Sequence, residues 1–257
     1  MTDDEIIALG DRNYYEAWTL LARTADGGDV REIDGVLIAS PASEVLWLNI
    51  AFVTRPLAGP DAQLAATKAY FAEHGLGFLV RIREGLDEAA ERACERLGMQ
   101  YTDTIPGMAL APIPPAPEGA PPVEVREVDA STFDAFVELN AASFDIPLDA
   151  CRRTITPRLL ESPDARWYLG LAGGTPVATS VLFVTDRIAG VHFVSTDAAY
   201  RGRGIGEAMT RHAVLEGAKL GLTAGYLEAS EMGYPIYQRM GFRHVTGYKT
   251  YVPKEFL

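Results

Sequence analysis

A proline-rich segment near the middle of the chain constrains the fold more than any other feature of the sequence. Six of the twelve residues from 111 to 122 are proline. Repeated proline excludes a helix and removes the backbone donors that a strand needs, so this segment is expected to be a semi-rigid linker. It predicts two domains, residues 1–111 and 123–257, joined by residues 112–122.

Composition narrows the class of protein. The chain has 257 residues, 48% of them hydrophobic, and no run of about twenty apolar residues, and its acidic start lacks the Lys or Arg of a secretory signal. We therefore expect a cytoplasmic protein with no membrane partner. The net charge of −12 argues against a nucleic-acid partner, because that binding needs clustered Lys and Arg. Cys94 and Cys151 lie far apart and outside any CxxC pattern, so no metal site is expected.

The hydrophobic patterns of the second half predict the element order β-α-α-β-β-β-α-β-α-β. Expected strands cover residues 123–128, 167–171, 176–184, 189–196, 226–229 and 242–252. Expected helices begin at a cap on Ser131, cover 149–160 with an interruption or fraying at Pro157, cover 205–220, and include a short one around Tyr237.

The first half gives a comparable order with weaker signals. Expected helices cover residues 12–25, 61–74 and 86–97, and expected strands cover 35–40, 45–54 and 77–83. Residues 95–99, Glu-Arg-Leu-Gly-Met, also resemble residues 238–242, Gln-Arg-Met-Gly-Phe. These similarities suggest a diverged internal repeat with one copy on each side of the linker.

The most informative stretch is residues 200–206, Tyr-Arg-Gly-Arg-Gly-Ile-Gly, between a predicted strand and a predicted amphipathic helix. A helix start has free backbone N–H groups and partial positive charge, and glycines let the backbone approach a ligand closely. Arg201 and Arg203 add charge. The pattern is typical of a diphosphate site, and a plain glycine-rich turn is the alternative.

Two other phosphate motifs can be tested by counting. The dinucleotide pattern G-x-G-x-x-G fails, because its last place is Glu207 when counted from Gly202 and Met209 when counted from Gly204. The Gly-Lys-Ser or Gly-Lys-Thr of a P-loop is absent. NAD or nucleotide binding is therefore disfavoured.

The pattern R-x-x-G-x-G formed by Arg201, Gly204 and Gly206 resembles motif A of the GCN5-related N-acetyltransferase (GNAT) family. Residues 234–242, with Tyr237 ahead of a closing Gly-Phe, resemble the end of that family's motif B. The resemblance covers residues 123–257 and departs at 197–199, where Asp-Ala-Ala replaces a frequent proline. It implies an α+β fold of two tandem GNAT-like domains, each a mixed, mostly antiparallel sheet flanked by helices.

The resemblance also implies a function, namely direct transfer of an acetyl group from acetyl-CoA to an amine of a small molecule or peptide. Strand backbone would bind the pantetheine arm and polarise the acyl carbonyl, at Val194, Ser195 and Thr196. Loop amides would take the pyrophosphate, at Arg201, Gly202, Arg203, Gly204, Ile205 and Gly206. A non-catalytic acyl-CoA sensor is the alternative, and a homodimer is left open.

Three side chains are candidates for proton transfer. Tyr237, at the motif B tyrosine, would be the general acid, because a phenol with a pKa near 10 is protonated at neutral pH; the alternative is a core aromatic. His192 is the first candidate base, since it shares a strand face with Val194 and Thr196 if no bulge intervenes; a buried structural histidine is the alternative. Glu228, on the next strand, is the reserve.

The first half lacks these features. Residues 55–60, Arg-Pro-Leu-Ala-Gly-Pro, stand where the glycine-rich loop is expected, and their two prolines delete backbone donors. Cys94 stands where Tyr237 does in the second half. We therefore expect a catalytically silent copy that covers a sheet edge or walls the acceptor pocket.

Overall fold

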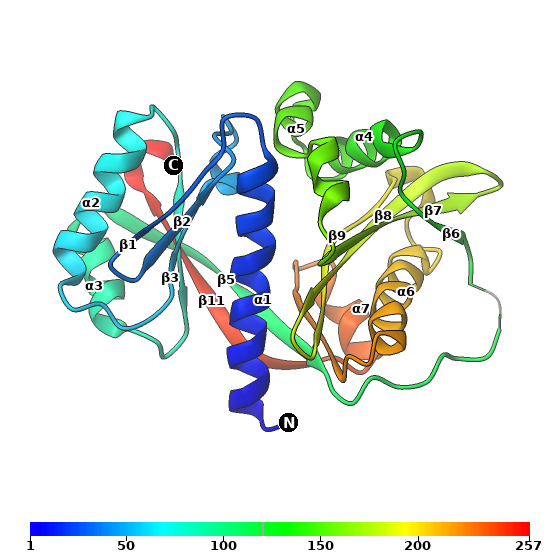
Figure 1. The fold of residues 1–257 in the computed structure, drawn as a ribbon. Coiled ribbons are helices and arrows are strands. Elements are labelled where there is room, and N and C mark those ends of the chain that lie inside the picture. Colours follow the sequence, from blue (N-terminus) through cyan, green and yellow to red (C-terminus); the bar gives the residue numbers. More distant parts are fainter. Residues whose placement is uncertain (120) are drawn as a thin grey trace.

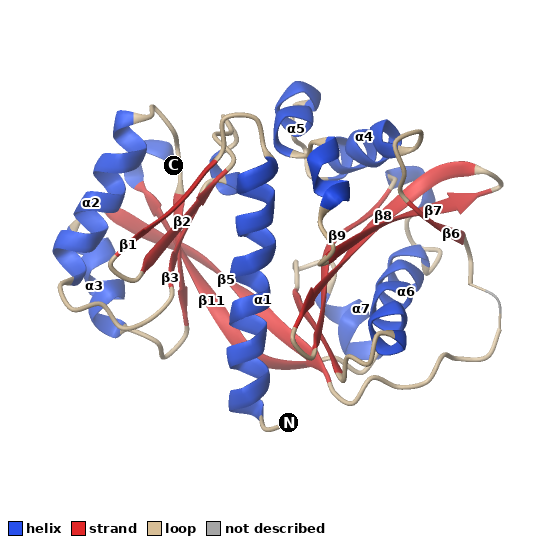
Figure 2. Cartoon of the chain, viewed as in Figure 1, coloured by secondary structure: helices blue, strands red, loops and turns tan. Residues whose placement is uncertain are grey.

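Eleven strands hydrogen-bond into one sheet in the computed structural model, which describes residues 1–119 and 121–257. The strand order is β1-β2-β3-β4-β11-β5-β10-β9-β8-β7-β6. Neighbouring strands are antiparallel except for the parallel pairs β3–β4 and β9–β10. Helices flank the sheet (Figures 1 and 2), which confirms the predicted mixed α+β fold.

Each half contributes a similar series of elements. In the first half these are α1 (Asp3–Thr24), β1 (Asp29–Ile33), β2 (Val36–Ser40), the 3₁₀ helix η1 (Leu46–Leu48), β3 (Ile50–Val53), α2 (Pro60–Glu73), β4 (Leu79–Arg83), α3 (Glu88–Arg96) and β5 (Met99–Leu110). In the second half they are β6 (Glu124–Glu127), α4 (Phe133–Ser143), α5 (Leu148–Thr154), η2 (Pro157–Glu161), β7 (Ala165–Ala172), β8 (Thr175–Thr185), β9 (Ile188–Thr196), η3 (Ala198–Tyr200), α6 (Ile205–Lys219), β10 (Ala224–Glu228), α7 (Tyr234–Arg239), β11 (Arg243–Pro253) and η4 (Lys254–Phe256).

The order predicted for the second half is confirmed element by element. One local detail is wrong, because the side chain of Asp129, not Ser131, accepts from the backbone before α4, at 2.8 Å from the Ser131 nitrogen and 3.1 Å from the Thr132 nitrogen. The linker contains no helix or strand in residues 112–119 and 121–122, and Ala120 lies outside the described residues. The two domain boundaries remain a prediction.

The first half departs from prediction in three places. Helix α1 begins at Asp3 instead of residue 12, because Thr2 and Glu5 cap it reciprocally. Residues 45–54 divide into η1 and β3, since the Asn49 amide donates to the carbonyls of Ser43 and Gly77, at 2.8 Å each, and holds a turn. Strand β1 has no strong pattern of its own and was not predicted.

The last strand of each half pairs with the next-to-last strand of the other half. Strand β11 lies between β4 and β5, and β5 lies between β11 and β10, all antiparallel. Both strands cross the centre of the molecule behind α1 in Figure 1. This exchange joins the two halves through main-chain hydrogen bonds and places first-half residues next to β10.

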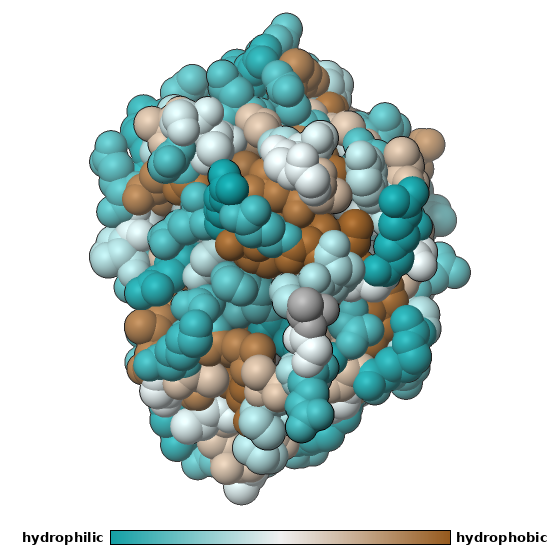
Figure 3. Space-filling model, turned by 90° about the vertical axis from the view of Figure 1, so that its right-hand side faces the viewer, coloured by the Kyte–Doolittle hydropathy of each residue, from teal (hydrophilic) through white to brown (hydrophobic). Residues whose placement is uncertain are grey.

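Both faces of the sheet carry a buried core. In the second half, α6 and α7 cover one face and α4 and α5 the other. In the first half, α2 and α3 cover one face, while α1 packs across the other and reaches β10. The outer face beside β6 is mainly hydrophilic with a few hydrophobic areas (Figure 3). None of the helices described in residues 1–119 and 121–257 has the length and apolar character needed to cross a membrane.

Candidate active site

The glycine-rich loop joins β9 to α6 and leaves the start of that helix open. Gly202 and Gly204 both have a φ of 75°, in the left-handed region that favours glycine, and a Cβ added at either would meet no atom within 4 Å. Gly204 is the N-cap, and no side chain caps α6. The N–H groups of the first helical turn, including those of Ile205 and Gly206, are therefore free to bind an anion.

The two arginines of the loop are exposed and brace it from outside. The Arg201 Nε donates to the Thr196 carbonyl at 3.1 Å, and Arg203 donates to the Ala199 carbonyl at 3.0 Å. The Asp197 carboxylate accepts from the Ala199 nitrogen at 2.8 Å and caps η3. The turn therefore forms without the proline that the sequence lacks.

Strands β9 and β10 separate beside this loop. Their parallel pairing covers only residues 188–190 and 224–226, although β9 continues to Thr196 and β10 to Glu228. On its other side β9 remains paired with β8 as far as Thr196. One backbone edge of residues 191–196, which includes Val194 to Thr196, therefore faces the gap and can pair with an extended ligand.

A bulge interrupts β9 just after His192. His192 lies opposite Val181 and Ser195 opposite Thr179, so three steps along β9 match two along β8. Phe193 has a φ of 49° at this point. His192 therefore shares its face with Ser195, and the shared face predicted for His192 with Val194 and Thr196 does not occur, because it required regular alternation.

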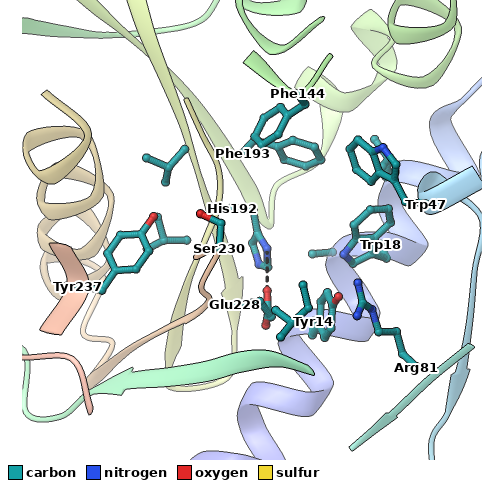
Figure 4. A pocket seen from close by; sticks show the side chains of 15 residues that line it. Tyr14, Trp18, Trp47, Arg81, Phe144, His192, Phe193, Glu228, Ser230 and Tyr237 are labelled. Atoms are coloured by element: carbon teal, nitrogen blue, oxygen red, sulfur yellow. Dashed lines mark ion pairs between the residues drawn. The ribbon is translucent and has the colours of Figure 1, made fainter. Parts of the chain in front are cut away.

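A cavity of about 240 Å³ lies at this opening and is walled by both halves of the chain (Figure 4). Its second-half lining is Phe144, Val191, His192, Phe193, Val194, Glu228, Ser230 and Tyr237. Its first-half lining is Tyr14, Ala17, Trp18, Leu21, Trp47, Arg81 and Ile105.

His192 is held by α1. The Asn13 amide nitrogen donates to the Phe183 carbonyl at 3.0 Å and to Thr185 Oγ1 at 3.2 Å, which turns its oxygen toward His192 Nε2 at 2.9 Å. Gly190 makes this approach possible, because a Cβ there would lie 1.8 Å from the Asn13 oxygen. The imidazole therefore carries its proton on Nε2 and leaves Nδ1 as an acceptor.

That acceptor faces Glu228, whose Oε2 is 3.6 Å from His192 Nδ1. The other oxygen of Glu228, Oε1, is buried and has no hydrogen-bond partner among the described residues. Burial lowers the pKa of His192 to about 4 and raises the pKa of Glu228 to about 8. At neutral pH the pair is thus a neutral imidazole beside a carboxyl group that gains its charge as the pH rises.

Tyr237 closes the side of the cavity nearest α6. Its side chain is 9% exposed and packs against Phe242, with ring centroids 5.9 Å apart. Burial raises the pKa of Tyr237, and a hydrogen bond with Thr210 opposes that rise only in part. The phenol is therefore protonated at neutral pH and can donate a proton.

The sequence patterns did not single out the first-half side of this cavity. Trp18 and Tyr14 lie on α1, Trp47 on η1 and Arg81 on β4, and none of them belongs to a recognised motif. Only Arg81 gave a signal, as a charge inside the apolar strand Leu-Val-Arg-Ile. No group of three His, Cys, Asp or Glu side chains suited to a metal occurs in the part of the chain that the structure describes.

Comparison with known structures places this arrangement in a known fold. A GCN5-related N-acetyltransferase from Kribbella flavida aligns with a TM-score of 0.72 at 18% identity, over 95% of each chain. One from Sphaerobacter thermophilus gives a TM-score of 0.60 at 18% identity, over 85% of this chain and 76% of that one. A functionally unknown conserved protein from Staphylococcus epidermidis gives 0.59 at 12% identity, over 86% and 91%.

Sequence comparison agrees for part of the chain. No curated protein sequence matches. Residues 163–244 match a family model described as an acetyltransferase (GNAT) domain, and this range includes the loop, His192, Glu228 and Tyr237. The family match thus covers about a third of the chain, and the overall fold is one that GCN5-related N-acetyltransferase structures share.

Proposed function

We propose that this protein is an acyl-CoA-dependent N-acyltransferase that transfers acetyl from acetyl-CoA to the amine of a small molecule or peptide. One observation carries the proposal: an uncapped helix start and an unpaired strand edge lead into a cavity that holds Glu228, His192 and Tyr237. Anion binding, binding of an extended chain and proton transfer are thus available along one continuous path.

The residues present fit acetyl-CoA. The amides of the first turn of α6 suit a pyrophosphate, and the edge of Val194 to Thr196 suits the amide-bearing pantetheine arm. When bound, acetyl-CoA supplies a thioester, whose C–S bond breaks as the acceptor nitrogen forms the new C–N bond. The exposed Arg201 and Arg203 add positive charge near the phosphates.

Glu228 is the better placed base, with His192 as its positioning residue. The free nitrogen of His192 faces Oε2 of Glu228, whereas Oε1 of Glu228 has no partner, and the Glu228 residue lines the cavity. A carboxyl group with its pKa raised to about 8 by burial is a stronger base than an ordinary one. Glu228 would take one proton from the attacking amine, and Nδ1 of His192 would accept from the protonated carboxyl group and so hold it in place.

Tyr237 would return a proton to the departing thiolate. Its burial keeps the phenol protonated, and its position on α7 lies across the cavity from the Glu228 and His192 pair (Figure 4). One proton thus leaves the amine for Glu228 and one passes from Tyr237 to sulfur, so the products are an amide and free coenzyme A.

The test combines binding and turnover. Acetyl-CoA should raise the Tm in a concentration-dependent way, and a panel of amines should include acceptors that release free thiol. Tyr237→Phe should lower kcat by about 10²-fold or more while the acetyl-CoA shift remains. A missing shift would sink the assignment of the loop, and a shift without turnover on any amine would favour an acyl-CoA sensor.

A further inference from the structure

Arg81 is a buried charge that the proposed transfer reaction does not use. Its side chain is 8% exposed and lines the cavity, on the side opposite Tyr237 (Figure 4). It leaves β4 on the face covered by α1, since its neighbours Val80 and Ile82 belong to the core under α2 and α3. The strand therefore presents a guanidinium to the inside of the cavity.

The protein supplies Arg81 with few partners. Its Nη1 donates to the hydroxyl of Thr250, on the neighbouring strand β11. Its Nε is buried without a hydrogen-bond partner, and no Asp or Glu among the described residues forms an ion pair with it. A buried guanidinium with an unsatisfied donor is costly, so a ligand that adds a hydrogen bond to this group gains binding energy from this position.

The neighbouring arginine provides a contrast. Arg83, two residues along β4, forms an ion pair with Asp11 at 2.8 Å and does not line the cavity. The same strand thus carries one arginine that forms an ion pair and one that forms none with the described residues, although the charge of Arg81 acts on Tyr14 and Glu228 in the same cavity. The planar fork of a guanidinium matches a carboxylate with two parallel hydrogen bonds.

The rest of the cavity suits a small, apolar molecule. Four aromatic side chains line the cavity with Arg81, namely Trp18, Trp47, Phe144 and Phe193, and Leu21 and Ile105 add aliphatic surface. A volume of about 240 Å³ is below the range of about 300 to 1,000 Å³ that is usual for drug-sized ligands. A compact acceptor fits this space better than a long chain does.

We propose that the acceptor is a free amino acid with an aromatic or large aliphatic side chain, whose carboxylate binds Arg81 while its amine faces Glu228. The proposal rests on the N-acyltransferase function proposed above and names the substrate class of that site. The apolar side chain would pack among the two tryptophans and two phenylalanines.

Binding separates this proposal from the transfer reaction itself. With coenzyme A present, phenylalanine, tryptophan and leucine are compared by calorimetry with phenylalaninamide, tryptophanamide and leucinamide, which keep the side chain and lose the carboxylate. At least one acid should bind about tenfold or more tightly than its amide. Arg81→Gln should abolish that preference, Arg81→Lys should keep part of it, and Arg83→Gln should leave it intact.

Turnover gives the second readout. The ratio of kcat/KM for acid over amide should fall about tenfold or more in Arg81→Gln, because only the acid carries the carboxylate that Arg81 would bind. Comparing this ratio between variants cancels the difference in amine pKa between an acid and its amide. The proposal is overturned if no acid binds more tightly than its amide, or if Arg81→Gln weakens both equally. If other amines are acetylated in that case, the N-acyltransferase function stands without this substrate class.

Discussion

Helices α2 and α6 occupy equivalent places in the two halves, but they begin in opposite ways. Each follows one strand of a parallel pair and precedes the other. The start of α6 is open and uncapped. Before α2, the Gly59 N–H donates to Gln63 Oε1 at 2.9 Å, the Leu57 N–H donates to Asp87 Oδ2 at 2.8 Å, and Pro60 has no N–H. The backbone N–H groups of Gly59 and Leu57, before α2, are thus already bonded to side chains of the first half and cannot bind a ligand in the way proposed for α6.

The two parallel strand pairs show the same contrast, because the pair in the first half is fully hydrogen-bonded and the pair in the second half is not. All four residues of β3 pair with β4, whereas β9 pairs with β10 over three of its nine residues. Cys94, which the sequence aligns with Tyr237, is fully buried, and burial raises the pKa of its thiol to about 12. The first half is closed at each place where the second half is open.

This difference teaches that one order of elements can carry a ligand site or a purely structural joint. A few hydrogen bonds at one helix start and a few missing strand pairs separate the two outcomes. The shared order supports our proposal that the halves are related copies and that the first is silent in catalysis. Its residues on α1, η1 and β4 nevertheless wall the cavity.

The largest effect is expected at Glu228, the base that we propose in the second half. Glu228→Gln keeps the shape of the side chain and removes its ability to take a proton, so kcat should fall by about 10² to 10⁴-fold with acetyl-CoA affinity unchanged. Glu84→Gln is the matched control, because Glu84 is exposed and follows β4 as Glu228 ends β10. Equal turnover in the wild type and Glu228→Gln would remove Glu228 from the mechanism.

The pH dependence should be the next largest effect. The base must be deprotonated, and burial raises the pKa of Glu228 to about 8, so kcat/KM should rise with pH and level off above about 8. Between pH 6 and 8 the expected rise is about 50-fold for a single ionisation. The acceptor should have an amine pKa below about 6, so that its own ionisation does not contribute. A flat profile across this range would rule out Glu228 as the titrating base.

The two glycines at the helix starts give a smaller and directly matched comparison. Gly204→Ala places a Cβ on a residue in the left-handed region, so the loop without ligand should relax to another conformation. Binding must then restore the left-handed conformation, which costs about 1 kcal/mol of binding free energy. The Kd for acetyl-CoA should then rise about fivefold, measured by calorimetry. Gly59→Ala should leave the Kd unchanged, because Gly59 has a φ of −144° and open space around it. Equal effects of the two variants would contradict the contrast between the halves.

The structure of the second half could be predicted well from the sequence, because the patterns that indicate its loop, strands and helices are local. The R-x-x-G-x-G pattern and the strand and helix around it depend on neighbouring residues, and the structure has the loop where they place it. Glu228 and His192 could be assigned to adjacent strands for the same reason. The bulge at Phe193 was missed, because nothing in the local pattern distinguishes it from regular alternation.

The remaining features depend on contacts between distant residues. The exchange of β5 and β11 between the halves leaves no local pattern, since each strand has the same composition wherever it pairs. The same applies to Asn13, which reaches His192 across 179 residues of sequence, and to Arg81, whose surroundings come from α1 and β11. Such positions become visible only when the fold brings both halves together.

The smallest effect on the site should come from a substitution at Asp87, whose carboxylate binds backbone N–H groups before α2 and at the start of α3. Asp87 accepts from Leu57, Ala89 and Ala90 nitrogens, so Asp87→Ala removes a helix cap and leaves buried donors unsatisfied. The free energy of unfolding should fall by about 2 kcal/mol in urea titrations, with no change in acetyl-CoA affinity. Asp197→Ala should instead weaken acetyl-CoA binding and leave the free energy of unfolding nearly unchanged. Asp197 caps the short, exposed η3 turn that leads into the glycine-rich loop. Weaker acetyl-CoA binding in Asp87→Ala would mean that the closed half also takes part in holding the cofactor.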